Sequence, residues 1–149
     1  MSDSTFNSEE FLDVEVQGQM ETAYTPIPEG EYPAFIKDLK SRDVNDQKVI
    51  DIVWQITDEQ VAAELSIDEP TVRQTIFLDL EESGALQFGP NKNVQLGRLR
   101  EALGQNNPNE PWSFRRLVGA GPCILKVGHR VDKNDPSKVY NDVQRVTSQ

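Results

Sequence analysis

Hydrophobic and polar residues alternate along two early stretches, residues 31–40 and 49–57, which is the pattern of β-strands. In the first stretch one face carries Tyr32, Ala34 and Ile36. The other face carries Pro33, Phe35, Lys37 and Leu39. In the second stretch one apolar face carries Ile50, Ile52, Trp54 and Ile56. We expect that face, including the tryptophan, to lie in the core. Polar turn formers fill the connection, so the pattern predicts an antiparallel pair.

Residues 71–80 fit two interpretations. The stretch alternates with period two, and its threonine, valine, isoleucine and phenylalanine content favours a strand. It also fits a helix with Val72, Ile76 and Leu80 on the inner face. Whether residues 58–70 form a helix before it is open as well.

The rest of the chain predicts one helix and two strands. Residues 93–103 carry valine and leucine near helical spacing and are followed by a glycine stop. Residues 123–131 and 139–147 predict strands joined by a polar hairpin loop, 132–138. With 71–80 as a strand, the order is three strands, a helix and two strands. That order predicts a mainly β fold, an OB-fold-like five-stranded Greek-key barrel with one helix between strands 3 and 4.

Length and charge add a domain boundary and an asymmetry. A chain of 149 residues predicts one domain, 26–149, preceded by a flexible acidic N-terminal segment, 1–25. The formal net charge is −10. Residues 1–91 hold 20 acidic and 5 basic side chains, whereas residues 92–149 hold 10 basic and 5 acidic ones. A basic C-terminal surface suits a polyanion, and the acidic segment is able to compete for it.

Several classes of protein are excluded or disfavoured. One cysteine and one histidine rule out a disulfide framework and a structural zinc site, and we expect Cys123 and His129 to be ordinary buried or partly buried residues. No phosphate loop or nucleophile–base pair is visible, so we expect neither an enzyme nor a cofactor. The chain has no long apolar run and no basic, apolar leader, so we expect a cytoplasmic protein without a membrane partner.

Several segments, in this order, resemble phage-encoded single-stranded-DNA-binding proteins, which are compact OB-fold proteins. The segments are PEGEY at 28–32, DIVWQITD at 51–58, TVRQTIFLDLEESGALQFGPNKNVQLGRLREALG at 71–104, PWSF at 111–114 and ILKVGHRVD at 124–132. The resemblance implies a protein that coats and protects single-stranded DNA in phage replication and recombination, without sequence specificity, in the host cell cytoplasm.

The resemblance also suggests partners. Many such proteins end in an acidic tail that recruits other proteins, whereas this chain ends in VQRVTSQ and carries its acidic, aromatic stretch at the N-terminus. The acidic N-terminal segment is therefore the candidate contact for replication or recombination proteins. A homo-oligomer is a further option, since the edge beside Pro33 is able to pair with another subunit.

Cations beside aromatic residues mark the candidate DNA-binding positions. Base stacking needs an exposed ring, and phosphates need a nearby cation. The candidates are Phe35, Lys37, Arg73, Phe77, Lys126, Arg130, Lys133, Lys138 and Tyr140. The alternative is that Phe35 or Phe77 packs under the N-terminal segment or at a dimer interface, and that the hairpin is merely solvated.

Two other functions fit the sequence. Residues 58–86 resemble a winged helix-turn-helix, with Pro70 at the first position of a recognition helix, which would bind duplex DNA as a regulator. Against it, residues 58–83 hold 8 acidic side chains and a single base, Arg73, which is unsuited to a duplex. The third class is an acidic OB-fold module for protein–protein or virion contacts that binds no nucleic acid.

Overall fold

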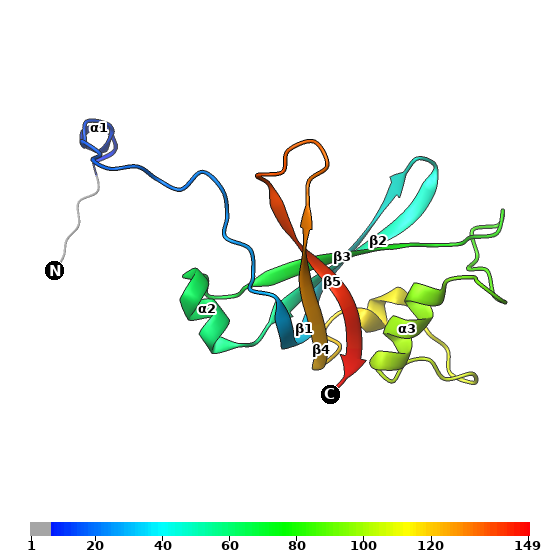
Figure 1. The fold of residues 1–149 in the computed structure, drawn as a ribbon. Coiled ribbons are helices and arrows are strands. Elements are labelled where there is room, and N and C mark those ends of the chain that lie inside the picture. Colours follow the sequence, from blue (N-terminus) through cyan, green and yellow to red (C-terminus); the bar gives the residue numbers. More distant parts are fainter. Residues whose placement is uncertain (1–6) are drawn as a thin grey trace.

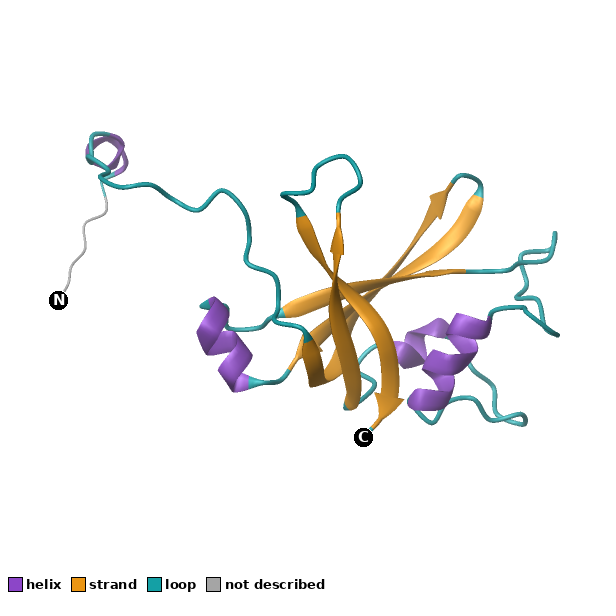
Figure 2. Ribbon diagram, in the orientation of Figure 1, coloured by secondary structure: helices purple, strands orange, loops and turns teal. Residues whose placement is uncertain are grey.

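Five strands and three short helices make up about half of the chain (Figures 1 and 2). A computed structural model describes residues 7–149, so residues 1–6 of the expected acidic segment lie outside the described residues. The elements are α1 (Ser8–Leu12), β1 (Gly30–Val44), β2 (Gln47–Ile56), α2 (Glu59–Leu65), β3 (Thr71–Phe77), α3 (Val94–Ala102), the 3₁₀ turn η1 (Phe114–Leu117), β4 (Cys123–Val131) and β5 (Val139–Ser148).

The strands form one antiparallel sheet in the order β3-β2-β1-β4-β5. β1 is the central strand: Gly30–Ala34 pairs with β4, and Ala34–Val44 pairs with β2. The sheet curls until its two edges, β3 and β5, come within 8 Å between Cα atoms, without a hydrogen-bonded ladder between them in the described part of the chain. The predicted mainly β class is confirmed, as an open five-stranded sheet.

The region of residues 58–80 contains one helix and then a strand. Asp58 caps α2, because its side chain accepts hydrogen bonds from the backbone N–H groups of Gln60 and Val61 at 2.9 and 3.1 Å. After α2 the chain enters β3, which pairs with β2 from Thr71 to Phe77. The recognition helix of the helix-turn-helix alternative is therefore wrong, because its residues form an extended strand inside the sheet.

A β-bulge divides β1 into two parts with opposite orientation. The pairing with β2 shifts between Ile36 and Asp38, and Lys37 is the extra residue. Before the bulge, Ala34 and Ile36 point into the core, with no exposed surface. After it, the orientation is reversed, so Leu39 packs against the core although the simple alternation placed it with Pro33 and Phe35.

The core lies between the curled sheet and α3. Trp54 is 0 % exposed, as expected, and its indole N–H donates to Gln74 Oε1 at 2.9 Å. Leu96 and Leu99 of α3 are buried against the same cluster. α3 begins where Asn93 is hydrogen-bonded to Asp79, two residues after β3: its amide donates to the Asp79 carbonyl at 2.9 Å and its Oδ1 accepts from the Asp79 N–H at 2.8 Å.

The N-terminal segment joins the domain at residue 27. Ile27 is buried, its N–H donates to Asn141 Oδ1 at 2.8 Å, and its carbonyl lies 2.6 Å from His129 Nε2. His129 is thus partly buried with a backbone partner. Before this anchor, residues 7–25 are exposed and α1 stands away from the domain (Figure 1). Among residues 7–149 no helix has both the length and the apolar character needed to cross a membrane.

Leu99→Ala tests the role of α3 in closing the core. Leu99 is 2 % exposed, so its truncation is expected to lower the free energy of unfolding by about 2–5 kcal/mol. The neighbouring exposed Arg98→Ala is the control, with an expected change within about 0.5 kcal/mol. Urea unfolding followed by tryptophan fluorescence measures both. Equal effects would mean that α3 does not complete the core.

Candidate functional site

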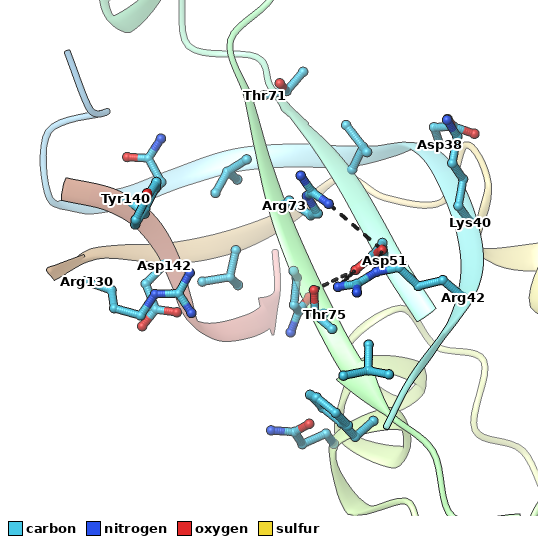
Figure 3. Close-up of a pocket in the computed structure, with 18 residues that line it drawn as sticks. Asp38, Lys40, Arg42, Asp51, Thr71, Arg73, Thr75, Arg130, Tyr140 and Asp142 are labelled. Carbon is cyan, nitrogen blue, oxygen red and sulfur yellow. Dashed lines mark hydrogen bonds and ion pairs between the residues drawn. The ribbon is translucent and has the colours of Figure 1, made fainter. Parts of the chain in front are cut away.

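An open cleft of about 1080 Å³ lies on the face of the sheet turned away from the core. Strands β1, β2 and β3 form its floor, and the β4–β5 hairpin forms its wall (Figure 3). The cleft is open to solvent. Its charged lining consists of the cations Lys40, Arg42, Arg73 and Arg130 and the carboxylates Asp38, Asp51 and Asp142. The chain as a whole is strongly acidic, yet this cleft has a cationic excess.

The pairing of strands arranges the floor in rows. Asp51 of β2 lies between Lys40 of β1 and Thr75 of β3. The next row places Val49 between Arg42 and Phe77. The bulge at Lys37 is what turns the even-numbered side chains of β1 from the core to this face.

Asp51 holds the floor together. It is 6 % exposed and accepts hydrogen bonds from the Arg42 Nε–H, from the Arg42 Nη2 at 3.3 Å and from the Thr75 hydroxyl at 2.6 Å. Arg73 Nη1 lies 3.9 Å from its carboxylate. The Arg42 guanidinium, followed by the Thr75 hydroxyl and the charge of Arg73, keeps the pKa of Asp51 below its usual value of 3.8 despite burial. Asp51 therefore stays ionised, orients the Arg42 guanidinium through two hydrogen bonds and attracts the guanidinium of Arg73.

The wall formed by the β4–β5 hairpin carries a cation and an aromatic ring. Arg130 of β4 and Tyr140 of β5 are a cross-strand pair, with the guanidinium carbon 5.8 Å from the ring centroid. The Tyr140 hydroxyl donates to Asp132 Oδ2 at 3.3 Å. Asp132 also accepts from the N–H groups of Asn134 and Asp135, and these bonds lower its pKa. These hydrogen bonds connect the loop between β4 and β5 to Tyr140 of the wall.

Exposed rings occur on both sides of the cleft. Phe77 is 46 % exposed and Tyr140 is 43 % exposed, and both line it. An exposed ring beside a guanidinium presents a flat apolar surface next to a positive charge. That combination accommodates planar, anionic ligands.

The structure brings four of the nine predicted site residues together. Those that line the cleft are Arg73, Phe77, Arg130 and Tyr140. The other five lie outside its lining. Phe35 is only half-exposed, since the backbone of Gly121 comes close to it: a Cβ added at Gly121 would lie 3.0 Å from the Phe35 Cβ. The bulged Lys37 forms an ion pair with Glu69 at 3.2 Å.

The remaining three predicted residues are exposed lysines on β4 and its loop. Lys126 lies opposite Glu31 and Arg145 in the sheet, away from the cleft. Lys133 and Lys138 lie in the loop between β4 and β5, which borders the cleft wall. These two belong to the rim rather than to the floor.

Sequence reasoning missed Lys40, Arg42 and Asp51. The predicted strand 31–40 leaves Arg42 outside, and an uninterrupted alternation places Lys40 on the same face as Ala34 and Ile36. The prediction for 49–57 assigns only its apolar face and gives Asp51 no partner. A signal was present: opposite charges at positions 40, 42 and 51 become neighbours once the hairpin turn is placed at 45–46. Within residues 7–149 no group of three or more histidine, cysteine or acidic side chains is arranged to hold a metal ion.

No protein-family model matches this chain, and no curated protein matches it either. The function is therefore argued from the geometry of the cleft and from the residues that line it.

Asp51→Asn tests the central carboxylate. Because the folded-state pKa of Asp51 lies below 3.8, its contribution is present above that pH and is lost as the pH falls through the folded-state pKa. We expect the variant to lose about 1–3 kcal/mol of unfolding free energy at pH 7. The difference from the wild type is expected to shrink as the pH falls below 3.8. Urea unfolding across this pH range measures it.

Asp43→Asn is the matched control, since Asp43 forms an exposed ion pair with Lys48 at 3.1 Å. Its effect is expected to stay below about 1 kcal/mol. A deficit of Asp51→Asn that is the same at every pH would contradict an ionised Asp51 as its cause.

Proposed function

We propose that the protein binds single-stranded DNA in this cleft, without sequence specificity and without catalysis. The observation that carries the proposal is that exposed rings and cations line the same cleft: Phe77, Arg73 and Arg42 on the floor, and the Tyr140–Arg130 pair on the wall opposite. Single-strand-binding grooves combine cations that follow the phosphates with rings on which bases stack. A duplex hides its base faces, so such rings favour an unpaired strand.

We further propose that the sheet is an OB-fold. Its strand order and the approach of β3 to β5 support this, because a five-stranded Greek-key barrel closes along those two strands. OB-folds bind oligonucleotides on the face of strands 2 and 3, between the loop joining strands 1 and 2 and the loop joining strands 4 and 5. The cleft occupies that position, and α3 lies between strands 3 and 4.

The biological setting in this proposal is phage replication and recombination, where such a protein coats and protects exposed strands. This setting rests on the segments within residues 28–132 that resemble phage-encoded single-stranded-DNA-binding proteins. The acidic chain is compatible with DNA binding because the local potential of the cleft, rather than the net charge, meets the phosphates. An acidic protein-interaction module is the competing function, and the first experiment distinguishes the two.

Titration of a labelled oligothymidine of about 12 nucleotides tests the proposal, since one OB-fold covers about 4–16 nucleotides. We expect single-strand-selective binding that weakens with salt. Each phosphate contact contributes about −0.7 to the log–log slope, so the four cations give a slope no steeper than about −3. Preference for a matched duplex competitor, or no binding at low salt, would refute the proposal, and the latter would favour the protein-interaction module.

Phe77→Ala and Arg73→Ala test the floor on the same oligonucleotide. Stacking on an aromatic ring is worth about 1–3 kcal/mol per base, so Phe77→Ala is expected to raise the dissociation constant roughly five- to hundredfold. Arg73→Ala is expected to weaken binding and flatten the salt slope. The matched controls are Phe88→Ala, an 86 % exposed ring outside the cleft, and Arg115→Ala, an exposed arginine on η1. If the controls weaken binding as much, the strand lies elsewhere.

A further inference from the structure

A second hollow lies beside α3 and shares no lining residue with the cleft. We call it the α3 groove. It has a volume of about 240 Å³ and runs between residues 86–89 and one face of α3. The residues that matter for the argument are Leu86, Phe88, Lys92, Leu96, Gly97 and Arg100.

The groove is apolar, and its helical wall has room for a side chain. A Cβ added at Gly97 would meet no atom within 4 Å, so the helix presents a gap there. Leu96 forms part of the floor, and Phe88 stands on the rim with 86 % of its surface exposed. A gap of this kind suits an apolar side chain from an incoming segment.

Positive charge surrounds the groove. Lys92 and Arg100 line it, and among the described residues neither has a carboxylate within 4.0 Å. The Arg100 guanidinium lies over the Trp112 ring, 4.3 Å from its centroid. Burial, and then the nearby charge of Arg116, lower the pKa of Arg100. An acidic ligand would relieve this repulsion between like charges.

The N-terminal segment has the complementary chemistry. Residues 8–16, SEEFLDVEV, interleave acidic and apolar side chains and contain no base. Leu12, Val14 and Val16 are 81 %, 60 % and 67 % exposed. The segment leaves the domain on the side opposite α3 (Figure 1), which suits the α3 groove of a neighbouring copy better than its own.

We propose that residues 8–16 of one copy dock in the α3 groove of a second copy. The two surfaces differ, so each bound copy offers a free segment at one end and a free groove at the other. Such head-to-tail contacts extend into open chains unless the rotation closes a ring. This contact between two copies is separate from the proposed DNA binding and forms without DNA.

Sedimentation velocity of the full chain over a range of concentrations tests the contact. We expect the average sedimentation coefficient to rise with concentration and to fall with added salt. Gly97→Leu fills the groove and Lys92→Glu reverses its charge, and each is expected to raise the dissociation constant of self-association about tenfold or more. Lys126→Glu, an exposed lysine on β4 away from the cleft and the α3 groove, is the control and is expected to associate like the wild type.

A charge exchange makes the test specific. A chain with Glu9→Lys and Glu10→Lys and a chain with Lys92→Glu are each expected to associate weakly alone and to associate when mixed. A monomer at every concentration, self-association that the groove variants leave unchanged, or a mixture no stronger than its components would each overturn the proposal. The 12-nucleotide oligothymidine titration on the same variants keeps this result separate, because so short a strand reports on one domain.

Discussion

The β-bulge at Lys37 is the constraint on which both faces of the sheet depend. β1 has to fill the core with its first half, pair with β4 and β2, and then present charged residues to solvent. A strand with strict alternation cannot exchange its faces part-way. One extra residue reverses the orientation, so that Ala34 and Ile36 pack inside while Lys40 and Arg42 reach the cleft. The backbone at the bulge stays satisfied, because the N–H and carbonyl of Ile36 bond to Ala120 and Gly119 at 2.9 and 2.7 Å.

Asp51 gives the cleft its electrostatic character. Burying a carboxylate is costly unless it is paired, and here Arg42, Arg73 and Thr75 pair with it. Two guanidinium groups therefore face one buried negative charge, in a cleft that the exposed ring of Phe77 also lines. A polyanion that approaches therefore meets oriented cations in a protein whose net charge is −10.

Much of the fold could be predicted from the alternation of residues, and the site only in part. The strands at 49–57, 123–131 and 139–147, the helix at 93–103 and the buried Trp54 follow directly from periodicity. Residues 71–80 fit a strand or a helix, because Val72, Ile76 and Leu80 match both the period of two and the helical period. Pairing with β2 makes residues 71–77 a strand. A bulge leaves no mark in the composition, so the change of face that brings Lys40 and Arg42 to the cleft could not be predicted. Asp51 lies on β2, and its role depends on the strand register that places it beside Lys40 and Thr75. The same uninterrupted alternation places Phe35 and Lys37 on one outward face. In the structure, Phe35 lies against Gly121 and the bulged Lys37 pairs with Glu69.

The most direct test of the central claim is photo-cross-linking of an oligonucleotide that carries 5-iododeoxyuridine, followed by mass spectrometry of the linked peptides. Iodouracil cross-links to aromatic side chains that stack on it. We predict linked peptides that contain Phe77 of the cleft floor and Tyr140 of the cleft wall. Links confined to Phe88, Trp112 or the N-terminal segment would contradict the account, because the strand would then lie outside the cleft.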